Sequence, residues 1–76
     1  MHKPNVVKMH VDERSEYRIR RGMPWLFDKY CDFGTSTPVA GDLVAVYGRR
    51  NQCIAIGLCD PYSPIRVRLL GGPGEF

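Results

Sequence analysis

The chain has 76 residues, of which 43% are hydrophobic, and a formal net charge of +3. This hydrophobic content excludes wholesale disorder, and a chain this short forms at most one domain with a thin core. Eight of the eleven basic residues are Arg, a bias that favours bidentate recognition of anions such as phosphate.

The first predicted elements are a strand and a short helix. Residues 6–11 alternate between apolar and polar side chains, which predicts a strand with one buried face. Asp12 is typical of a helix N-cap, and Gly22 suits the left-handed conformation that closes a helix. Acidic residues near the start of this helix and arginines near its end complement the helix macrodipole.

This predicted helix carries a basic ridge. At 100° per residue, Arg14, Arg18 and Arg21 fall on one stripe, and Ile19 lies well away from it. Two turns of helix are not stable alone in water, so Ile19 must dock on the sheet. Tyr17 is a second candidate for this docking contact.

The segment after the helix is expected to be extended and buried. Pro24 blocks continuation of the helix, and Trp25 with Phe27 begins the extended run. Trp25 has two interpretations: a core anchor that fixes the helix against the sheet, or a stacking platform for an unpaired base. The apolar Leu26 and Phe27 beside it favour the core.

The second half of the chain predicts three strands. Residues 35–38 form a loop, residues 43–47 a strand, and residues 48–52 a hairpin turn. Residues 53–59 are apolar on both faces, which indicates a central strand. Strands at short, regular intervals with one brief helix predict a mainly β fold of mixed α/β character, a small β-barrel with one short helix.

The last strand, residues 65–70, follows a turn and alternates sharply. Its apolar side chains face the core, so Arg66 and Arg68 are expected to stand together on the outer face. Two adjacent guanidinium groups repel each other, and the phosphates of a nucleic acid would relieve that repulsion. A solvated strand face that keeps the domain soluble is the alternative.

Two further arginines, Arg49 and Arg50, are predicted at the hairpin tip, either as solvated turn residues or as part of a larger basic surface. If the helix end and the last strand are neighbours, their arginines form one basic patch.

Asp42 and Asp60 are expected to accept local backbone hydrogen bonds at turns. With Ser63 also read as a turn residue, we expect no catalytic residue and no enzymatic activity in this chain.

Cysteines and histidines predict neither disulfides nor a metal site. Cys53 and Cys59 fall on one predicted strand, roughly 20 Å apart, which is too far for a disulfide. His2 and His10 are isolated, without zinc-ligand spacing. We interpret Cys31, Cys53 and Cys59 as small apolar side chains that fill space, which is typical of a protein in a reducing compartment. With no membrane-length apolar run and no signal peptide, a cytoplasmic location without membrane contact is expected.

Four motifs in order resemble a PUA domain, more narrowly the N-terminal PUA domain of class I ribosomal RNA large-subunit methyltransferases that make 5-methylcytosine. The motifs are residues 20–27 (RRGMPWLF), 41–46 (GDLVAV), 56–58 (IGL) and 60–70 (DPYSPIRVRLL). The resemblance implies a PUA-like β-pseudobarrel over residues 1–70, with residues 71–76 as a Gly/Pro-rich linker. It also implies an RNA-binding module that positions structured RNA, ribosomal RNA first, for an S-adenosylmethionine-dependent catalytic domain absent from this chain.

The expected RNA-binding surface combines this resemblance with the basic pattern. It comprises the arginines of the helix, the hairpin tip and the last strand: Arg14, Arg18, Arg20, Arg21, Arg49, Arg50, Arg66 and Arg68. No cofactor is expected in this chain. The alternative function is a protein-interaction barrel that docks an acidic partner or its own catalytic domain, for which Leu70 and Phe76 would matter most.

Overall fold

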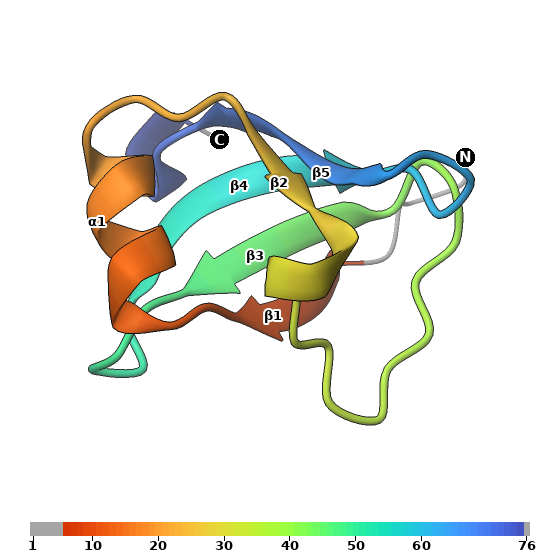
Figure 1. The fold of residues 1–76 in the computed structure, drawn as a ribbon, viewed down its shortest axis with the longest axis horizontal. Helices are drawn as coiled ribbons and strands as arrows, with labels where there is room; N and C mark the ends of the chain where they lie inside the picture. Colours follow the sequence, from red (N-terminus) through yellow and green to blue (C-terminus); the bar gives the residue numbers. More distant parts are fainter. Residues whose placement is uncertain (1–5, 76) are drawn as a thin grey trace.

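A computed structural model describes residues 6–75, and the predicted strands and helix are all present in it (Figure 1). Two short 3₁₀ turns, η1 and η2, accompany them. In chain order the elements are β1 (Val6–His10), α1 (Glu13–Arg20), β2 (Trp25–Phe27), η1 (Asp28–Tyr30), β3 (Leu43–Tyr47), β4 (Cys53–Cys59), β5 (Ile65–Gly71) and η2 (Pro73–Glu75).

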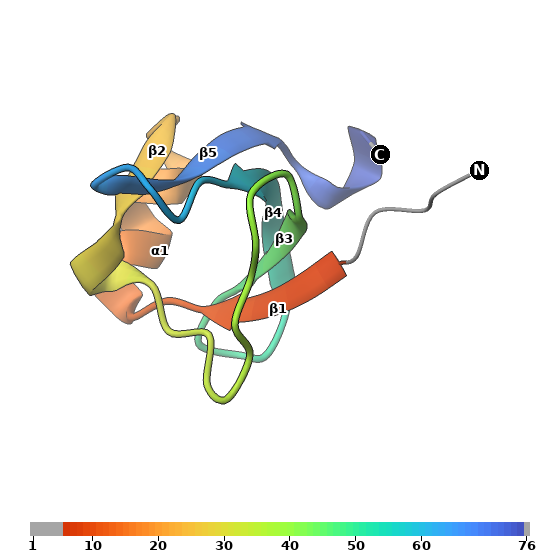
Figure 2. The ribbon, with the colours of Figure 1, turned by 90° about the vertical axis from the view of Figure 1, so that its right-hand side faces the viewer.

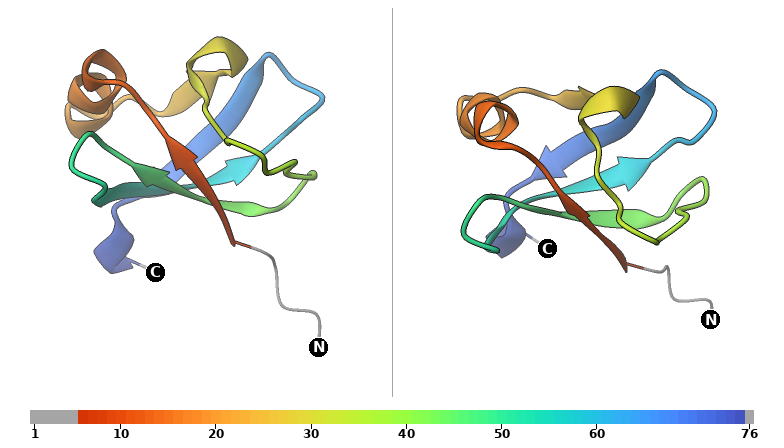
Figure 3. Two further views of the ribbon diagram at one scale, coloured as in Figure 1. Left: turned by 90° about the horizontal axis from the view of Figure 1, so that it is seen from below. Right: turned by 60° about the horizontal axis from the view of Figure 1, so that its bottom comes forward.

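The strands form a single five-stranded sheet in the order β1-β3-β4-β5-β2, so β4 is the central strand, as predicted. The pair β1 and β3 is parallel, and every other pair is antiparallel. The sheet coils around the interior, with α1 at one end of the coil (Figure 2). Seen from below, β1 and β2 lie on opposite sides of the opening between the sheet edges (Figure 3). This arrangement confirms the predicted small β-barrel.

Helix α1 begins and ends where the sequence predicts. The Asp12 carboxylate accepts a hydrogen bond from the backbone N–H of Ser15 at 2.8 Å, which is an N-cap. Gly22 has φ +99°, the left-handed conformation that closes a helix. Ile19 is buried, which confirms that it docks on the sheet. Tyr17 is 61% exposed, so the expectation that it also docks there is wrong. At 100° per residue Tyr17 lies 200° from both buried positions, Ser15 and Ile19.

The core is built from alternate residues of the strands together with the inner face of α1. Met9, Leu26, Val44, Val46 and Val67 are fully buried. Because strand side chains alternate between faces, each strand contributes its inward set to this interior. The thin core expected from chain length is therefore shared among all five strands.

The expectation that Trp25 and Phe27 are buried is wrong. Each is 41% exposed, whereas Leu26 between them is completely buried. Strand β2 alternates like the others, and the position facing the core belongs to Leu26. Three consecutive apolar residues conceal this alternation in the sequence.

The turns are held by the predicted local hydrogen bonds. The Asp42 carboxylate accepts from the Val39 N–H at 3.0 Å, and the Asp60 carboxylate accepts from the Tyr62 N–H at 3.1 Å. Ser63 Oγ accepts from a backbone N–H at 3.1 Å. These contacts confirm the structural roles assigned to the three side chains.

The end of the chain continues the sheet. Strand β5 runs through Gly71, and η2 then lies against β4. The boundary at residue 70 stays a prediction. The expectations for His2 and Phe76 concern residues outside the described part of the chain. No helix within residues 6–75 is long and apolar enough to cross a membrane.

Candidate nucleic-acid interface

The eight arginines fall into three groups in the structure. They lie on and just after α1 (Arg14, Arg18, Arg20, Arg21), at the β3–β4 hairpin tip (Arg49, Arg50), and on β5 (Arg66, Arg68). Because only a cation that is not already neutralised offers its full charge to an anionic ligand, the partners of each arginine decide its value to a binding site.

The helix–hairpin corner, defined here as Glu13, Glu16, Arg20, Arg49 and Arg50, is largely neutralised from within. Arg20 Nε lies 3.0 Å from Glu16 Oε2, and Arg49 Nη1 lies 2.8 Å from Glu13 Oε1. Glu16 Oε1 also accepts the Arg49 backbone N–H at 2.8 Å. Its three arginines therefore face two carboxylates, which leaves one unpaired positive charge, that of Arg50.

Glu16 is the central carboxylate of this corner. The hydrogen bond from the Arg49 backbone lowers the pKa of Glu16 from its ordinary value, and the bond from Arg20 lowers it further. Glu16 consequently stays ionised at neutral pH and keeps its contacts with the Arg20 side chain and the Arg49 backbone. It also joins α1 to the hairpin tip, because its two oxygens bind one partner on each element.

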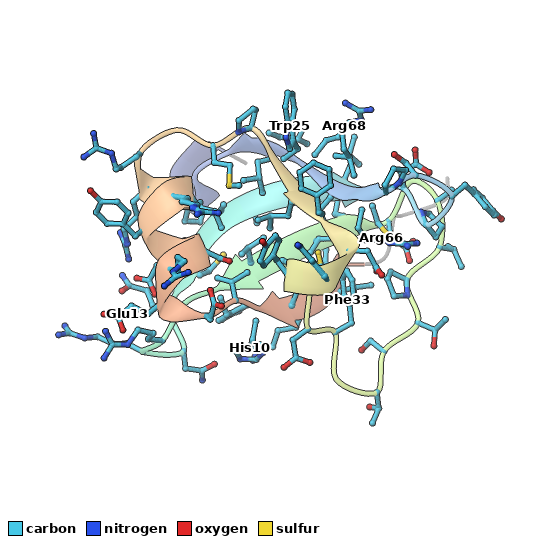
Figure 4. All side chains as sticks on the ribbon, in the orientation of Figure 1. His10, Glu13, Trp25, Phe33, Arg66 and Arg68 are labelled. Carbon is cyan, nitrogen blue, oxygen red and sulfur yellow. The ribbon has the colours of Figure 1, made fainter. Side chains whose placement is uncertain are left out.

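Arg66 is a structural residue, so the expectation of two unpaired guanidinium groups on β5 is wrong for it. Its Nε lies 3.0 Å from Asp28 Oδ1, although that N–H has no aligned acceptor within residues 6–75, and its Nη1 donates to the Pro61 carbonyl. The pairing of β2 with β5 skips Arg66, which therefore sits in a bulge. A bulge re-aims its side chain, here toward η1 (Figure 4).

Arg68 behaves as predicted and is exposed on the outer face of β5. It pairs directly across the sheet with Trp25, and both side chains point away from the barrel interior (Figure 4). No carboxylate of the described residues lies within ion-pair distance of Arg68. We call Trp25, Phe27 and Arg68 the β2–β5 edge.

A cleft of about 510 Å³ separates this edge from the helix. Its lining combines cations, aromatic rings and one carboxylate: Arg18, Met23, Phe27, Asp28, Lys29, Tyr30 and Pro64. The cleft thus places Arg18 of the helical ridge on one side of β2, and the pairing with β5 places Arg68 on the other. Strand β2 thus lies between these two arginines, and the single basic patch formed by the helix and the last strand stays a prediction.

Among the described residues, five arginines form no ion pair with a carboxylate: Arg14, Arg18, Arg21, Arg50 and Arg68. Three of these lie on the helical ridge. Arg21 is held against Tyr17, with its guanidinium carbon 5.5 Å from the ring centroid. The unpaired arginines are therefore concentrated on and just after α1, with one more on the β2–β5 edge (Arg68) and one at the hairpin tip (Arg50).

Sequence reasoning missed the surface roles open to Phe27, Lys29 and Tyr30. The signal that could have found Phe27 is the two-residue period of a strand, which puts Trp25 and Phe27 on one face once Leu26 is assigned to the core. Lys29 and Tyr30 belong to the 3₁₀ turn η1, which no pattern predicted.

A protein-family comparison agrees with this geometry. Residues 9–71 match the model of a family described as a PUA-like domain. The chain belongs to the PUA-like domain family.

This PUA-like domain is also similar to part of a longer protein. A ribosomal RNA large subunit methyltransferase from Deinococcus radiodurans is 38% identical to it over 64 residues. The match covers 84% of the chain and 16% of that relative. The chain therefore spans only a small part of the protein it matches, and the larger part of that protein has no counterpart in it.

Two of the cysteine thiols, those of Cys31 and Cys59, have pKa values above the ordinary range. Burial raises the pKa of Cys31 to about 12, and Asp28 adds to the effect. Burial also raises the pKa of Cys59. Both groups are protonated at neutral pH, and a thiol attacks only as its thiolate. Within residues 6–75 no three metal-ligating side chains gather in one place.

Proposed function

We propose that this PUA-like domain binds structured RNA, ribosomal RNA first of all, through α1 and the β2–β5 edge. The supporting observation is that some of its arginines are paired with carboxylates and others are not. Those of the helix–hairpin corner and Arg66 are mostly held by carboxylates, whereas those facing the cleft and the edge are not. Unpaired guanidinium groups are suited to phosphate, which they bind in a bidentate fork.

We further propose that the domain positions RNA for an S-adenosylmethionine-dependent rRNA (cytosine-5) methyltransferase domain in a longer cytoplasmic polypeptide. The name of the Deinococcus relative supports the methyltransferase part. The described fold does not fit the cofactor itself, because such sites need a glycine-rich turn between a strand and a helix. Here Val11 and Asp12 occupy the turn between β1 and α1, so we assign the cofactor to the other domain.

A titration with RNA tests the binding proposal. The chain should bind a structured rRNA fragment more tightly than duplex DNA of equal length, because A-form shape and 2′-hydroxyl groups are recognised. Binding should weaken steeply with salt. Equal affinity for the DNA, or no binding to any structured RNA at low salt, would contradict the proposal.

Matched arginine pairs make this test specific to the surface. The double variant Arg18→Gln, Arg68→Gln should reduce the salt slope by about one for each phosphate contact that is lost. The control Arg20→Gln, Arg49→Gln removes the same charge from the helix–hairpin corner and should change the slope much less. If the control has the larger effect, RNA binds at the corner.

A protein-interaction barrel is the second candidate, and one observation favours it. Leu58 and Leu70 are exposed on β4 and β5, on strands whose inner faces are already packed. A partner captured from nuclease-treated extract, and lost on Leu58→Ser with Leu70→Ser, would support this function. Capture that depends on intact RNA would contradict it.

A further inference from the structure

We propose that β2 is a stacking platform for two unpaired nucleotides, with one base on Trp25, the next on Phe27, and a phosphate bound by Arg68. The inference rests on the proposed function and specifies which part of a structured RNA is recognised. It assigns a role to the two aromatic rings of β2, which both lie outside the core. The occupant is a short single-stranded segment, such as a bulge, loop or overhang beside a stem.

The rings have the geometry that such a platform needs. Trp25 and Phe27 stand two positions apart on one strand, which corresponds to roughly 6.6 Å along the backbone. Each retains 41% exposure, and the fully buried Leu26 anchors the strand between them. Sheets that present aromatic rings are a recurring way to bind unpaired bases, because every base has a stacking face.

Hydrogen bonds fix this strand at both of its ends. The Leu69 N–H donates to the Pro24 carbonyl at 2.8 Å, just before the platform begins. The Asp28 N–H donates to the Pro64 carbonyl at 3.1 Å, just after it ends. The rings therefore project from a backbone that is held before any ligand arrives, which lowers the entropy lost on binding.

Cations surround the platform where a nucleic-acid backbone would run. Arg68 stands directly across from Trp25, and Arg18 and Lys29 line the cleft beside Phe27. Asp28 is the one carboxylate in the cleft lining, and Arg66 already lies 3.0 Å from it. An anion entering the cleft therefore meets two cations and one carboxylate that is already neutralised.

This combination favours nucleic acid over an apolar protein partner. A hydrophobic surface laid on Trp25 and Phe27 would cover Arg68 without supplying a carboxylate, and burying an unpaired charge is costly. A nucleotide satisfies both groups, because its base covers the aromatic ring and its phosphate pairs with the guanidinium group.

Tryptophan fluorescence tests the platform on the unmodified protein, because Trp25 is the single tryptophan of the chain. Two RNAs share one stem, and one of them adds a two-nucleotide overhang. The overhang RNA should quench Trp25 fluorescence on binding, and the blunt stem should leave it nearly unchanged. Binding of the overhang RNA without quenching would overturn the proposal.

Substitutions measure the contribution of each ring. Trp25→Leu keeps an apolar side chain but removes the stacking face, and it should weaken overhang binding roughly 5- to 150-fold with little effect on the blunt stem. Phe27→Leu should likewise lower the affinity for the overhang RNA. Trp25→Phe, which keeps an aromatic ring, should retain most of that affinity. The control is Tyr62→Leu, since Tyr62 is 90% exposed on the turn before β5, and it should change nothing.

The outcomes separate this inference from the function on which it rests. If Trp25→Leu weakens both RNAs equally, or neither, the platform is excluded while salt-dependent stem binding still supports an RNA-binding domain. If neither RNA binds at low salt, both proposals fail. A loss confined to the overhang RNA establishes the platform, because the retained affinity for the blunt stem shows that the variant is folded.

Discussion

The helix–hairpin corner and the β2–β5 edge both present arginine at the surface, yet they differ in what surrounds it. At the corner, Glu13 and Glu16 hold Arg49 and Arg20 at 2.8 and 3.0 Å. At the edge, Arg68 has an exposed tryptophan across from it and no carboxylate partner among the described residues. Counting arginines alone therefore does not locate an anion-binding surface, because ion pairs already occupy two of the three arginines at the corner.

The two regions also differ in what they do for the fold. The corner fastens α1 to the β3–β4 hairpin through the two oxygens of Glu16. At the edge, the fully buried contact of β2 comes from Leu26, whereas Trp25 and Phe27 each keep 41% of their surface exposed. The following predictions test this division between a corner that joins two elements and an edge that stays partly open.

The largest expected effect is on β2 itself. Leu26→Ala should lower the free energy of unfolding by about 2–5 kcal/mol, since a fully buried leucine leaves a cavity. Trp25→Ala should cost about 2 kcal/mol or less, because part of its ring is already in water. Urea unfolding of both variants measures the difference. If Trp25→Ala is the more damaging, the edge belongs to the core and cannot be a free surface.

Next in size is the contrast between the two arginines of β5. Arg66→Ala should destabilise the fold by about 1–2 kcal/mol, a value reduced for the partial exposure of its pair with Asp28. Arg68→Ala should stay within about 0.5 kcal/mol of the parent. Thermal unfolding compares them. Equal losses of unfolding free energy would mean that Arg68 also has a structural partner, and Arg68 would then no longer be proposed as a phosphate contact.

A smaller effect is expected when the corner is released from its carboxylates. The double variant Glu13→Gln, Glu16→Gln frees Arg49 and Arg20, and it should raise RNA affinity at low salt roughly twofold to fivefold, the range of exposed ion pairs. Gel-shift or anisotropy titrations at two salt concentrations measure this gain. The gain should vanish at high salt, where exposed charges are screened. A gain that persists there would require a direct RNA contact at the corner.

The smallest effect concerns pH. Hydrogen bonds lower the pKa of Glu16 from 4.5 and that of Asp12 from 3.8. A carboxyl group whose pKa falls on folding stabilises the native state above its unfolded pKa, and this contribution is lost as pH falls through the folded value. The melting temperature should therefore decline below about pH 4.5, and Glu16→Gln should flatten the upper part of that decline. An identical pH profile in the variant would show that the hydrogen bonds of Glu16 do not stabilise the fold.

The sequence by itself determined the elements and their ends, because these depend on near neighbours. The N-cap at Asp12, the helix closure at Gly22 and the alternation of residues 6–11 need only a few adjacent residues. The central position of β4 also followed from its apolar residues, although Leu58 on its outer face is exposed.

Only the tertiary structure decided which arginines are available and which aromatic rings are exposed. Arg66 meets Asp28 from a distant part of the chain, and a bulge in the β2–β5 pairing turns its side chain toward that partner. Likewise, either face of the run Trp25–Phe27 could have met the core, because all three residues are apolar. The register against β5 selects Leu26, and such long-range pairings are set by the packing of the whole sheet rather than by local pattern.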